Sequence, residues 1–148
     1  MRKVSARAEI PAPPDVLFNY LSDPAKLPEW QTGIVRAERT ATGPVGVGST
    51  AHVVRELLGQ RLAVDLTVTG YEAGQLLALS SSASGISVDA TLVLVPAEGG
   101  TVTDLTFEMA IRAQNIFMSP LEGMVASAAQ KDIAESVARL RERFEKGD

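Results

Sequence analysis

Glycine-containing turns divide the middle of the chain into short segments rich in valine, leucine and threonine. The turn signals recur at residues 42–44, 46–49, 57–60, 72–75, 82–85 and 97–100. Short β-branched runs between such turns predict an antiparallel meander joined by hairpins. From about Ser119 to Lys146 the apolar period becomes helical. The chain therefore offers one sheet and one long helix to cover it.

Four two-residue hairpin loops, at residues 58–59, 73–74, 84–85 and 98–99, predict one register for the meander. In this register Glu56 lies opposite Arg61 and His52 opposite Asp65, and Leu79 lies between Val68 and Ala90. The same rule places Leu92 opposite Leu105 and Val88 opposite Met109. One face then collects Leu62, Val64, Leu66, Val68, Leu77, Leu79, Val88, Ala90, Leu92, Leu105, Phe107, Met109 and Ile111. The other face is polar, with Asp65, Thr67, Thr69, Asp89, Thr91, Asp104, Thr106 and Glu108.

A single helix is too narrow to cover this apolar face if the sheet is flat. Seven strands span roughly 30 Å, whereas a helix with its side chains is about 10 Å across. The sheet must therefore curl around the helix, and this leaves one end open.

The stretch at residues 10–30, "IPAPPDVLFNYLSDPAKLPEW", predicts two short helices that close the open end. Pro13 and Pro14 suit the first turn of one helix, where a missing N–H costs nothing. Its expected apolar stripe is Val16, Leu17, Tyr20 and Leu21.

The second short helix begins with its own proline. Ser22 or Asp23 is expected to cap it, with Pro24 at its first position and Pro28 at its end.

The long helix changes in side-chain size along its inward stripe. The far end carries Ile133, Val137, Leu140 and Phe144, whereas the near end has the small-residue run "GMVASAA" at 123–129. We expect empty volume under the first half of this helix, beside Leu66, Leu79, Ala90 and Phe107. The alternative is that the sheet approaches the helix more closely there.

Composition excludes several classes of protein. The net charge is −4, the pI is near 5.0 and no lysine–arginine cluster is present, which argues against nucleic-acid binding. No apolar run reaches the ~20 residues of a membrane helix, and the N-terminus has no signal-like apolar region. We expect a single domain over residues 1–148, located in the cytoplasm and without stable membrane insertion. An oligomer is allowed but not indicated.

Several segments resemble the START/Bet v 1-like superfamily, in particular its polyketide cyclase/dehydrase-like and lipid-transport branch. They are the stretch at residues 10–30, "GVGS", "VTGYEAGQLLAL", "EGGTVTDLTF" and the final amphipathic helix. The resemblance implies an α+β helix-grip fold. Its parts are a seven-stranded curved antiparallel sheet around a long C-terminal helix, and two short helices after strand one. It also implies an internal cavity for a hydrophobic small molecule.

Polar residues that face inward are the candidates for hydrogen bonds to a ligand in such a cavity. The register directs Arg55, Gln75, Ser81 and Thr103 toward the apolar face. An inward arginine needs a partner or a ligand oxygen, unless it lies at a strand end and extends to solvent. Ser81 either binds a ligand hydroxyl or is a turn residue.

Each aromatic or apolar residue near the expected entrance has more than one possible role. Trp30 and Tyr20 line the cavity mouth, or Trp30 packs the short helices onto the sheet. Ile116, Phe117 and Met118 gate the entrance, bind a partner, or belong to the core. The complete set of expected ligand-binding residues is Trp30, Arg55, Leu66, Leu79, Ser81, Ala90, Phe107, Met109, Phe117, Val125, Ala126 and Ala129.

The sequence supplies no recognisable catalytic or metal-binding constellation. The chain has no cysteine and one histidine, His52, which the register places on the outer face. No catalytic residue, metal ligand or cofactor is therefore predicted. A carrier or sensor of a hydrophobic molecule needs only an apolar pocket, whereas a cyclase-type enzyme would be indicated by two inward titratable groups in contact. No such pair is evident, so the sequence favours the carrier. A partner-binding module is a third, weaker reading.

Overall fold

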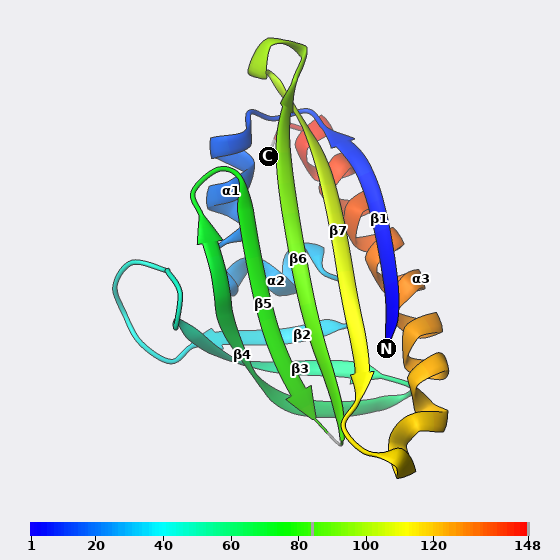
Figure 1. The fold of residues 1–148 in the computed structure, drawn as a ribbon. Helices are drawn as coiled ribbons and strands as arrows, with labels where there is room; N and C mark the ends of the chain where they lie inside the picture. Colours follow the sequence, from blue (N-terminus) through cyan, green and yellow to red (C-terminus); the bar gives the residue numbers. More distant parts are fainter. Residues whose placement is uncertain (84, 148) are drawn as a thin grey trace.

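The computed structural model describes residues 1–83 and 85–147, and within them one sheet has seven strands in the order β1-β7-β6-β5-β4-β3-β2 (Figure 1). All neighbouring strands are antiparallel. The strands are β1 (Arg2–Ile10), β2 (Ile34–Arg39), β3 (Thr50–Leu57), β4 (Gln60–Glu72), β5 (Leu76–Ala83), β6 (Ile86–Ala97) and β7 (Val102–Ala113). The helices are α1 (Pro14–Leu21), η1 (Pro24–Lys26), α2 (Leu27–Trp30), η2 (Glu98–Gly100), η3 (Ile116–Met118) and α3 (Ser119–Glu145).

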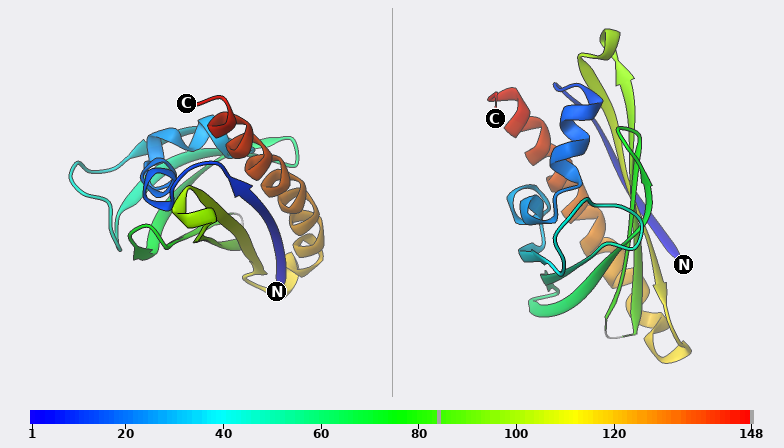
Figure 2. Two further views of the ribbon diagram at one scale, coloured as in Figure 1. Left: turned by 90° about the horizontal axis from the view of Figure 1, so that it is seen from above. Right: turned by 90° about the vertical axis from the view of Figure 1, so that its left-hand side faces the viewer.

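The sheet curves around α3, as seen from above in Figure 2, and this confirms the expected helix-grip fold. Strand periodicity places the apolar residues on the concave face, where Val64, Leu79, Phe107 and Ile111 are buried. The helix packs mainly along β1 and β7. Its buried stripe contains the expected Ala126, Ala129, Ile133, Val137 and Leu140, and Phe144 packs against its far end.

The predicted register is correct for β3–β4, for β5–β6 and for the Val68–Leu79 pair of β4–β5, but wrong between β6 and β7. Glu56 pairs with Arg61, His52 with Asp65, and Leu79 with both Val68 and Ala90, as expected. Leu92, however, pairs with Phe107 rather than Leu105, and Val88 with Ile111 rather than Met109. The reason is the connection at 98–101, which contains η2 and is two residues longer than predicted. A shift of two residues keeps every side chain on the same face of the sheet, so the residues predicted to face the core still face it.

The β4–β5 turn also differs from the prediction. Glu72 pairs with Leu76, which leaves a three-residue turn instead of two. A β-bulge between Val68 and Gly70 offsets the extra residue farther along β4. Gln75 therefore lies in the turn and is exposed, rather than facing inward as expected. The pairing of Ala83 with Ile86 agrees with the predicted β5–β6 loop, of which Ser84 lies outside the described residues.

The first short helix presents a different face from the one predicted. Leu17, Phe18 and Leu21 are buried, whereas Val16 is 50% exposed. Phe18 was missed by the sequence pattern, and its ring packs edge-on against Tyr71 at 5.2 Å between ring centroids. The helix begins one residue later than the proline pair suggests, because Pro13 is its N-cap. The buried side is that of Leu17, Phe18 and Leu21 because this side of the helix packs against the sheet.

The second short helical segment consists of two pieces. Asp23, one of the two residues predicted as the cap, caps η1 by accepting a hydrogen bond from the Ala25 N–H at 3.1 Å. Pro28 does not end the segment, because it lies in the first turn of α2. A proline at this position removes no intrahelical hydrogen bond, because N–H groups in the first turn have no acceptor within the helix.

Polar and aromatic contacts hold the short helices against the end of α3. Glu29 accepts a hydrogen bond from the Tyr20 hydroxyl at 3.1 Å and pairs with Arg143 at 2.8 Å. The ring of Phe144 packs edge-on against Tyr20 at 5.6 Å between centroids. Burial, together with the hydrogen bond to Glu29, raises the pKa of Tyr20 to about 12. These contacts explain how two helices too short to be stable alone remain in place.

A buried hydroxyl anchors the turn that leads into α1. Thr103 is fully buried on β7, and its Oγ1 donates a hydrogen bond of 2.8 Å to the carbonyl of Ala12. The Thr103→Val variant keeps the shape but leaves that carbonyl without its donor. We expect urea denaturation to show a loss of about 1–3 kcal/mol in the free energy of unfolding.

Thr106→Val, on the outer face of the same strand, is the matched control and should change stability by less than about 0.5 kcal/mol. Equal effects of the two variants would contradict an anchoring role for Thr103.

Candidate ligand-binding cavity

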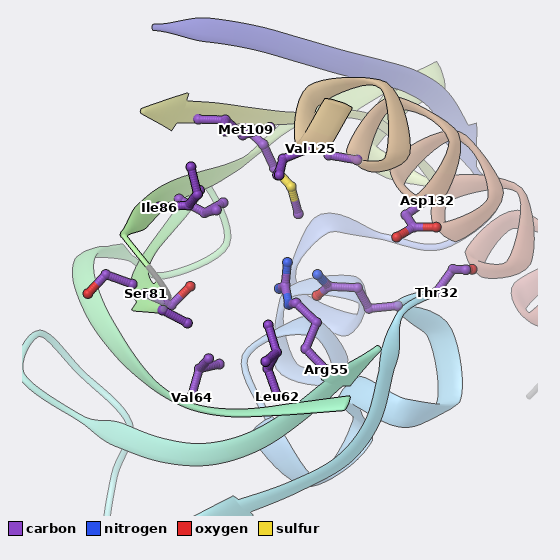
Figure 3. A pocket seen from close by; sticks show the side chains of 15 residues that line it. Thr32, Arg55, Leu62, Val64, Ser81, Ile86, Met109, Val125 and Asp132 are labelled. Carbon is purple, nitrogen blue, oxygen red and sulfur yellow. The ribbon is translucent and has the colours of Figure 1, made fainter. Parts of the chain in front are cut away.

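A cavity lies between the first half of α3 and the concave face of the sheet (Figure 3). It has about 620 Å³ of empty space, counted together with its open mouth. Most of its wall is aliphatic and comes from β4, β6, β7 and α3. The lining residues are Gln31, Thr32, Arg55, Leu62, Val64, Ser81, Ser82, Ala83, Ile86, Val88, Met109, Ile111, Val125, Ala129 and Asp132.

Local structure explains why these side chains converge. Leu62 and Val64 are two residues apart on β4, and so are Ile86 and Val88 on β6, so each pair shares the concave face. Val125, Ala129 and Asp132 are four and three residues apart on α3, which places them on one side of the helix. The small side chain of Ala129 leaves the space that a larger residue would fill.

The structure brings together part of the predicted site. Arg55, Ser81, Met109, Val125 and Ala129 line this cavity. Leu66 and Leu79 instead line a second space between the sheet and the short helices. Ala90, Phe107, Ala126 and Trp30 are buried in the core and line neither space. The cavity thus lies nearer the β5–β6 hairpin than the sequence suggested.

Two of the predicted ligand-binding residues lie outside the cavity wall. Trp30 is 1% exposed, and its ring lies 5.8 Å from that of Phe107, so it packs α2 onto the sheet instead of lining the mouth. Phe117 is 87% exposed and does not contribute to the wall. Burial of Ile116 and Phe117 as ordinary core, one of the expectations, is therefore wrong.

Arg55 supplies a cation in the apolar wall. Its β3 position faces Ile34 on one side and Leu62 on the other, and its side chain extends into the cavity (Figure 3). Within residues 1–83 and 85–147, its Nε is buried and has no hydrogen-bond partner. Burial lowers the pKa of the guanidinium, and the carboxylate of Asp132 partly opposes this. Because arginine stays protonated, the cavity holds an incompletely satisfied positive group.

Asp132 is the functional candidate that sequence reasoning missed. It projects from α3 toward the cavity (Figure 3) and is partly buried. Burial is the main cause that raises the pKa of its carboxyl; Glu135 adds to it, whereas Arg55 and Lys131 oppose it. The spacing from Val125 and Ala129 is the signal that could have identified it.

The loop before β2 fixes the polar side of the cavity. The Thr32 N–H donates to Ser136 Oγ at 2.9 Å, and that hydroxyl donates to the carbonyl of Asp132 at 2.7 Å. Gly33 has a φ of 99°, and a Cβ there would lie 3.0 Å from Asp132 Oδ2. A glycine therefore allows both the backbone conformation and the close approach of the loop to the carboxyl.

This geometry suits an apolar molecule with one acidic or carbonyl oxygen at Arg55. Asp132 adds a group that can accept or return a proton in the same cavity. His52 lies on the outer face as predicted, where its Nδ1 contacts Asp65. Among the described residues, no group of histidine, cysteine or acidic side chains has the arrangement of a metal site.

Comparisons with known proteins agree with the fold. The family model described as "Polyketide cyclase / dehydrase and lipid transport" matches residues 1–145. An uncharacterised protein of Mycobacterium tuberculosis is 25% identical over 145 residues, which cover 97% of this chain and 99% of the relative.

Two solved structures illustrate the similarity in fold. A START superfamily protein from Mycobacterium smegmatis superposes with a TM-score of 0.80 at 18% identity, over 99% of each chain. The Zhui aromatase/cyclase from Streptomyces sp. R1128 superposes with a TM-score of 0.79 at 12% identity, over 98% of this chain and 94% of that one. In the described part of this chain, no helix has the length and apolar character needed to cross a membrane.

A larger side chain at Ala129 tests whether the cavity is empty. We expect Ala129→Phe to leave the thermal unfolding temperature unchanged or raised, because the ring enters the cavity that Ala129 lines. Uptake of the apolar dye N-phenylnaphthylamine, followed by fluorescence, should be blocked.

Ala126→Phe is the matched control, since Ala126 is as buried as Ala129 but does not line the cavity. Overpacking should destabilise this control by about 1–3 kcal/mol. A similar loss in Ala129→Phe would mean that the sheet closes onto the helix there.

The raised pKa of Asp132 predicts a pH-dependent effect on stability. A raised folded-state pKa means that the ionised carboxyl opposes folding; this penalty appears as the pH rises through that pKa and is absent below the ordinary carboxyl range. Asp132→Asn should therefore raise the unfolding temperature at neutral pH. The gain should disappear in acid, where Asp132 is protonated in both states.

Asp89→Asn, at an exposed position on the outer face of β6, is the control and should show no such gain. A lower unfolding temperature for Asp132→Asn at neutral pH would show instead that the carboxylate stabilises the fold through Arg55.

Proposed function

Because the chain belongs to the polyketide cyclase / dehydrase and lipid transport family, we propose that its cavity binds a hydrophobic small molecule that carries an acidic or carbonyl oxygen. The observation that carries this proposal is Arg55, a cation in an aliphatic wall whose buried Nε has no partner within residues 1–83 and 85–147. In this proposal the protein acts as a carrier or sensor.

The energetics of Arg55 support a ligand that brings an oxygen. A buried N–H without a partner lowers stability by about 1–3 kcal/mol, and more when the group is charged. A bound carboxylate, phenolate or carbonyl would accept hydrogen bonds from the guanidinium and recover that loss. The aliphatic walls from β4, β6 and β7 would hold the rest of the molecule.

A cyclase-type enzyme is the second candidate, and Asp132 is the observation that favours it. Arg55 would stabilise an enolate oxygen of a keto compound, while Asp132 would take the proton from the adjacent carbon. The two side chains line the same cavity, although the structure gives no direct hydrogen bond between them within the described residues. Action in the cytoplasm stays a prediction from the sequence.

Two dyes with the same skeleton test the role of Arg55. Anilinonaphthalene sulfonate carries a negative group, whereas N-phenylnaphthylamine is neutral. Arg55→Met keeps most of the stem and removes the charge. We expect its affinity for the sulfonate dye to fall by ~1.5–3 kcal/mol, the contribution of a hydrogen bond to a charged group, with the neutral dye unaffected. Fluorescence titration measures both affinities.

Equal affinities of the wild type and Arg55→Met for the sulfonate dye would refute an oxygen-binding role. Native mass spectrometry of the purified protein would complement the titration by detecting a co-purified molecule. For the enzymatic alternative, benzoylacetone in heavy water should exchange its acidic protons faster with the wild type than with Asp132→Asn. The same rate in both would leave the carrier as the function.

A further inference from the structure

An exposed group of apolar side chains lies at the end of the molecule where α3 begins. Ile116 is 81% exposed, Phe117 87%, Met124 56% and Leu121 36%. We call these four residues the apolar tip. In Figures 1 and 2 this segment projects beyond the sheet, at the opposite end from the η2 turn. The tip therefore protrudes, and no other segment of the described residues covers it.

The chain holds the tip in a defined conformation. Asn115 accepts a hydrogen bond from the Met118 N–H at 3.1 Å, which closes the η3 turn. Met118 packs against the β5–β6 hairpin so closely that a Cβ on Gly85 would lie 2.6 Å from its Cγ. Glu122 accepts a hydrogen bond from the Ala113 N–H at 2.9 Å. These contacts turn Met118 inward, while Ile116 and Phe117 stay exposed.

Cations lie around the tip although the chain as a whole has a net charge of −4. A guanidinium nitrogen of Arg2 lies 3.5 Å from where a Cβ on Gly123 would be. Arg112 is exposed and contacts the sulfur of Met1 at 3.4 Å. Lys3 is also exposed, on strand β1, and pairs with Glu108 at 3.9 Å, while the N-terminal ammonium pairs with Glu122 at 2.7 Å. The positive groups of Arg2, Lys3, Arg112 and the N-terminus therefore outnumber the carboxylates of Glu108 and Glu122 that pair with them, and this local excess suits an anionic surface.

We propose that the apolar tip inserts into the interface of an anionic phospholipid bilayer, with Arg2, Lys3 and Arg112 against the lipid phosphates. Apolar side chains that project beside cations are the combination that binds such a surface. A protruding, highly exposed phenylalanine and isoleucine fit a deformable lipid interface better than a preformed protein groove.

The tip lies next to the cavity wall, so contact with a bilayer would bring the cavity close to the lipids. Met118 packs against the β5–β6 hairpin, and Ala83 and Ile86 at the two ends of that hairpin line the cavity. Val125, which follows Met124 of the tip on α3, lines the cavity as well. A bilayer that receives the tip would therefore lie next to the cavity. The surface binding itself does not depend on the proposed ligand.

Sedimentation with lipid vesicles tests this inference. One set of vesicles contains phosphatidylcholine alone, and the other contains an equal mixture with phosphatidylserine. The wild type should sediment with the mixed vesicles and much less with the neutral ones, and added salt should weaken the binding. The double variant Ile116→Ser/Phe117→Ser should bind the mixed vesicles at least about tenfold more weakly, because each side chain loses apolar burial.

The matched control is Val47→Ser/Val95→Ser, which removes two exposed apolar side chains away from the tip and should bind as the wild type does. Arg2→Gln/Arg112→Gln should lose the preference for phosphatidylserine. Circular dichroism verifies that each variant is folded, and dye uptake shows separately whether the cavity still functions.

The proposal is overturned if the wild type does not bind the mixed vesicles, or if the tip variant binds them as well as the wild type does. A wild-type dimer in size-exclusion chromatography that the tip variant abolishes, without vesicle binding, would assign the tip to contact between two copies and would also overturn it.

Discussion

The packing of α3 against the concave face of the sheet determines the rest of the structure. Because one helix must cover seven strands of the described chain, the sheet curves, and the helix lies closest to β1 and β7. Side-chain size then differs along the helix. Ile133, Val137 and Leu140 fill the space at one end, whereas Ala129 leaves a cavity at the other. The cavity is thus a direct consequence of how the helix is built.

Folding disfavours the charged forms of the two ionisable groups in the cavity. Burial lowers the pKa of Arg55 and raises the pKa of Asp132, so in each case the charged form is less favourable in the folded protein than in the unfolded chain. Groups that lower stability within a cavity are typical of binding and catalytic sites, and this supports a functional role for the pair.

The two ends of the molecule have different chemistry. At one end, a hydrogen bond joins Tyr20 to Glu29, and these two residues contact α3 through the Glu29–Arg143 ion pair and the edge-on packing of Tyr20 and Phe144. At the other end, Ala83 and Ile86 of the β5–β6 hairpin line the cavity, and the turn that packs on this hairpin exposes Phe117. The end where α3 begins therefore carries both a cavity wall and the exposed apolar tip, whereas the other end is closed by the short helices.

The sequence by itself determined which residues share a face of the sheet, because side chains on a strand alternate strictly. That is why Phe107 and Met109 face inward although the predicted β6–β7 pairing is wrong by two residues. It also determined the inward stripe of α3, through the spacing of its apolar residues.

Only the tertiary structure decided where the empty space lies and which polar groups reach it. Turn lengths, the bulge in β4 and the buried side of α1 are set by packing between segments distant in sequence, which no local pattern contains. Asp132 and Arg55 are 77 positions apart by number, and they line one cavity because the curved sheet brings β3 under α3. Trp30 was separated from that cavity for the same reason, since α2 packs it onto Phe107.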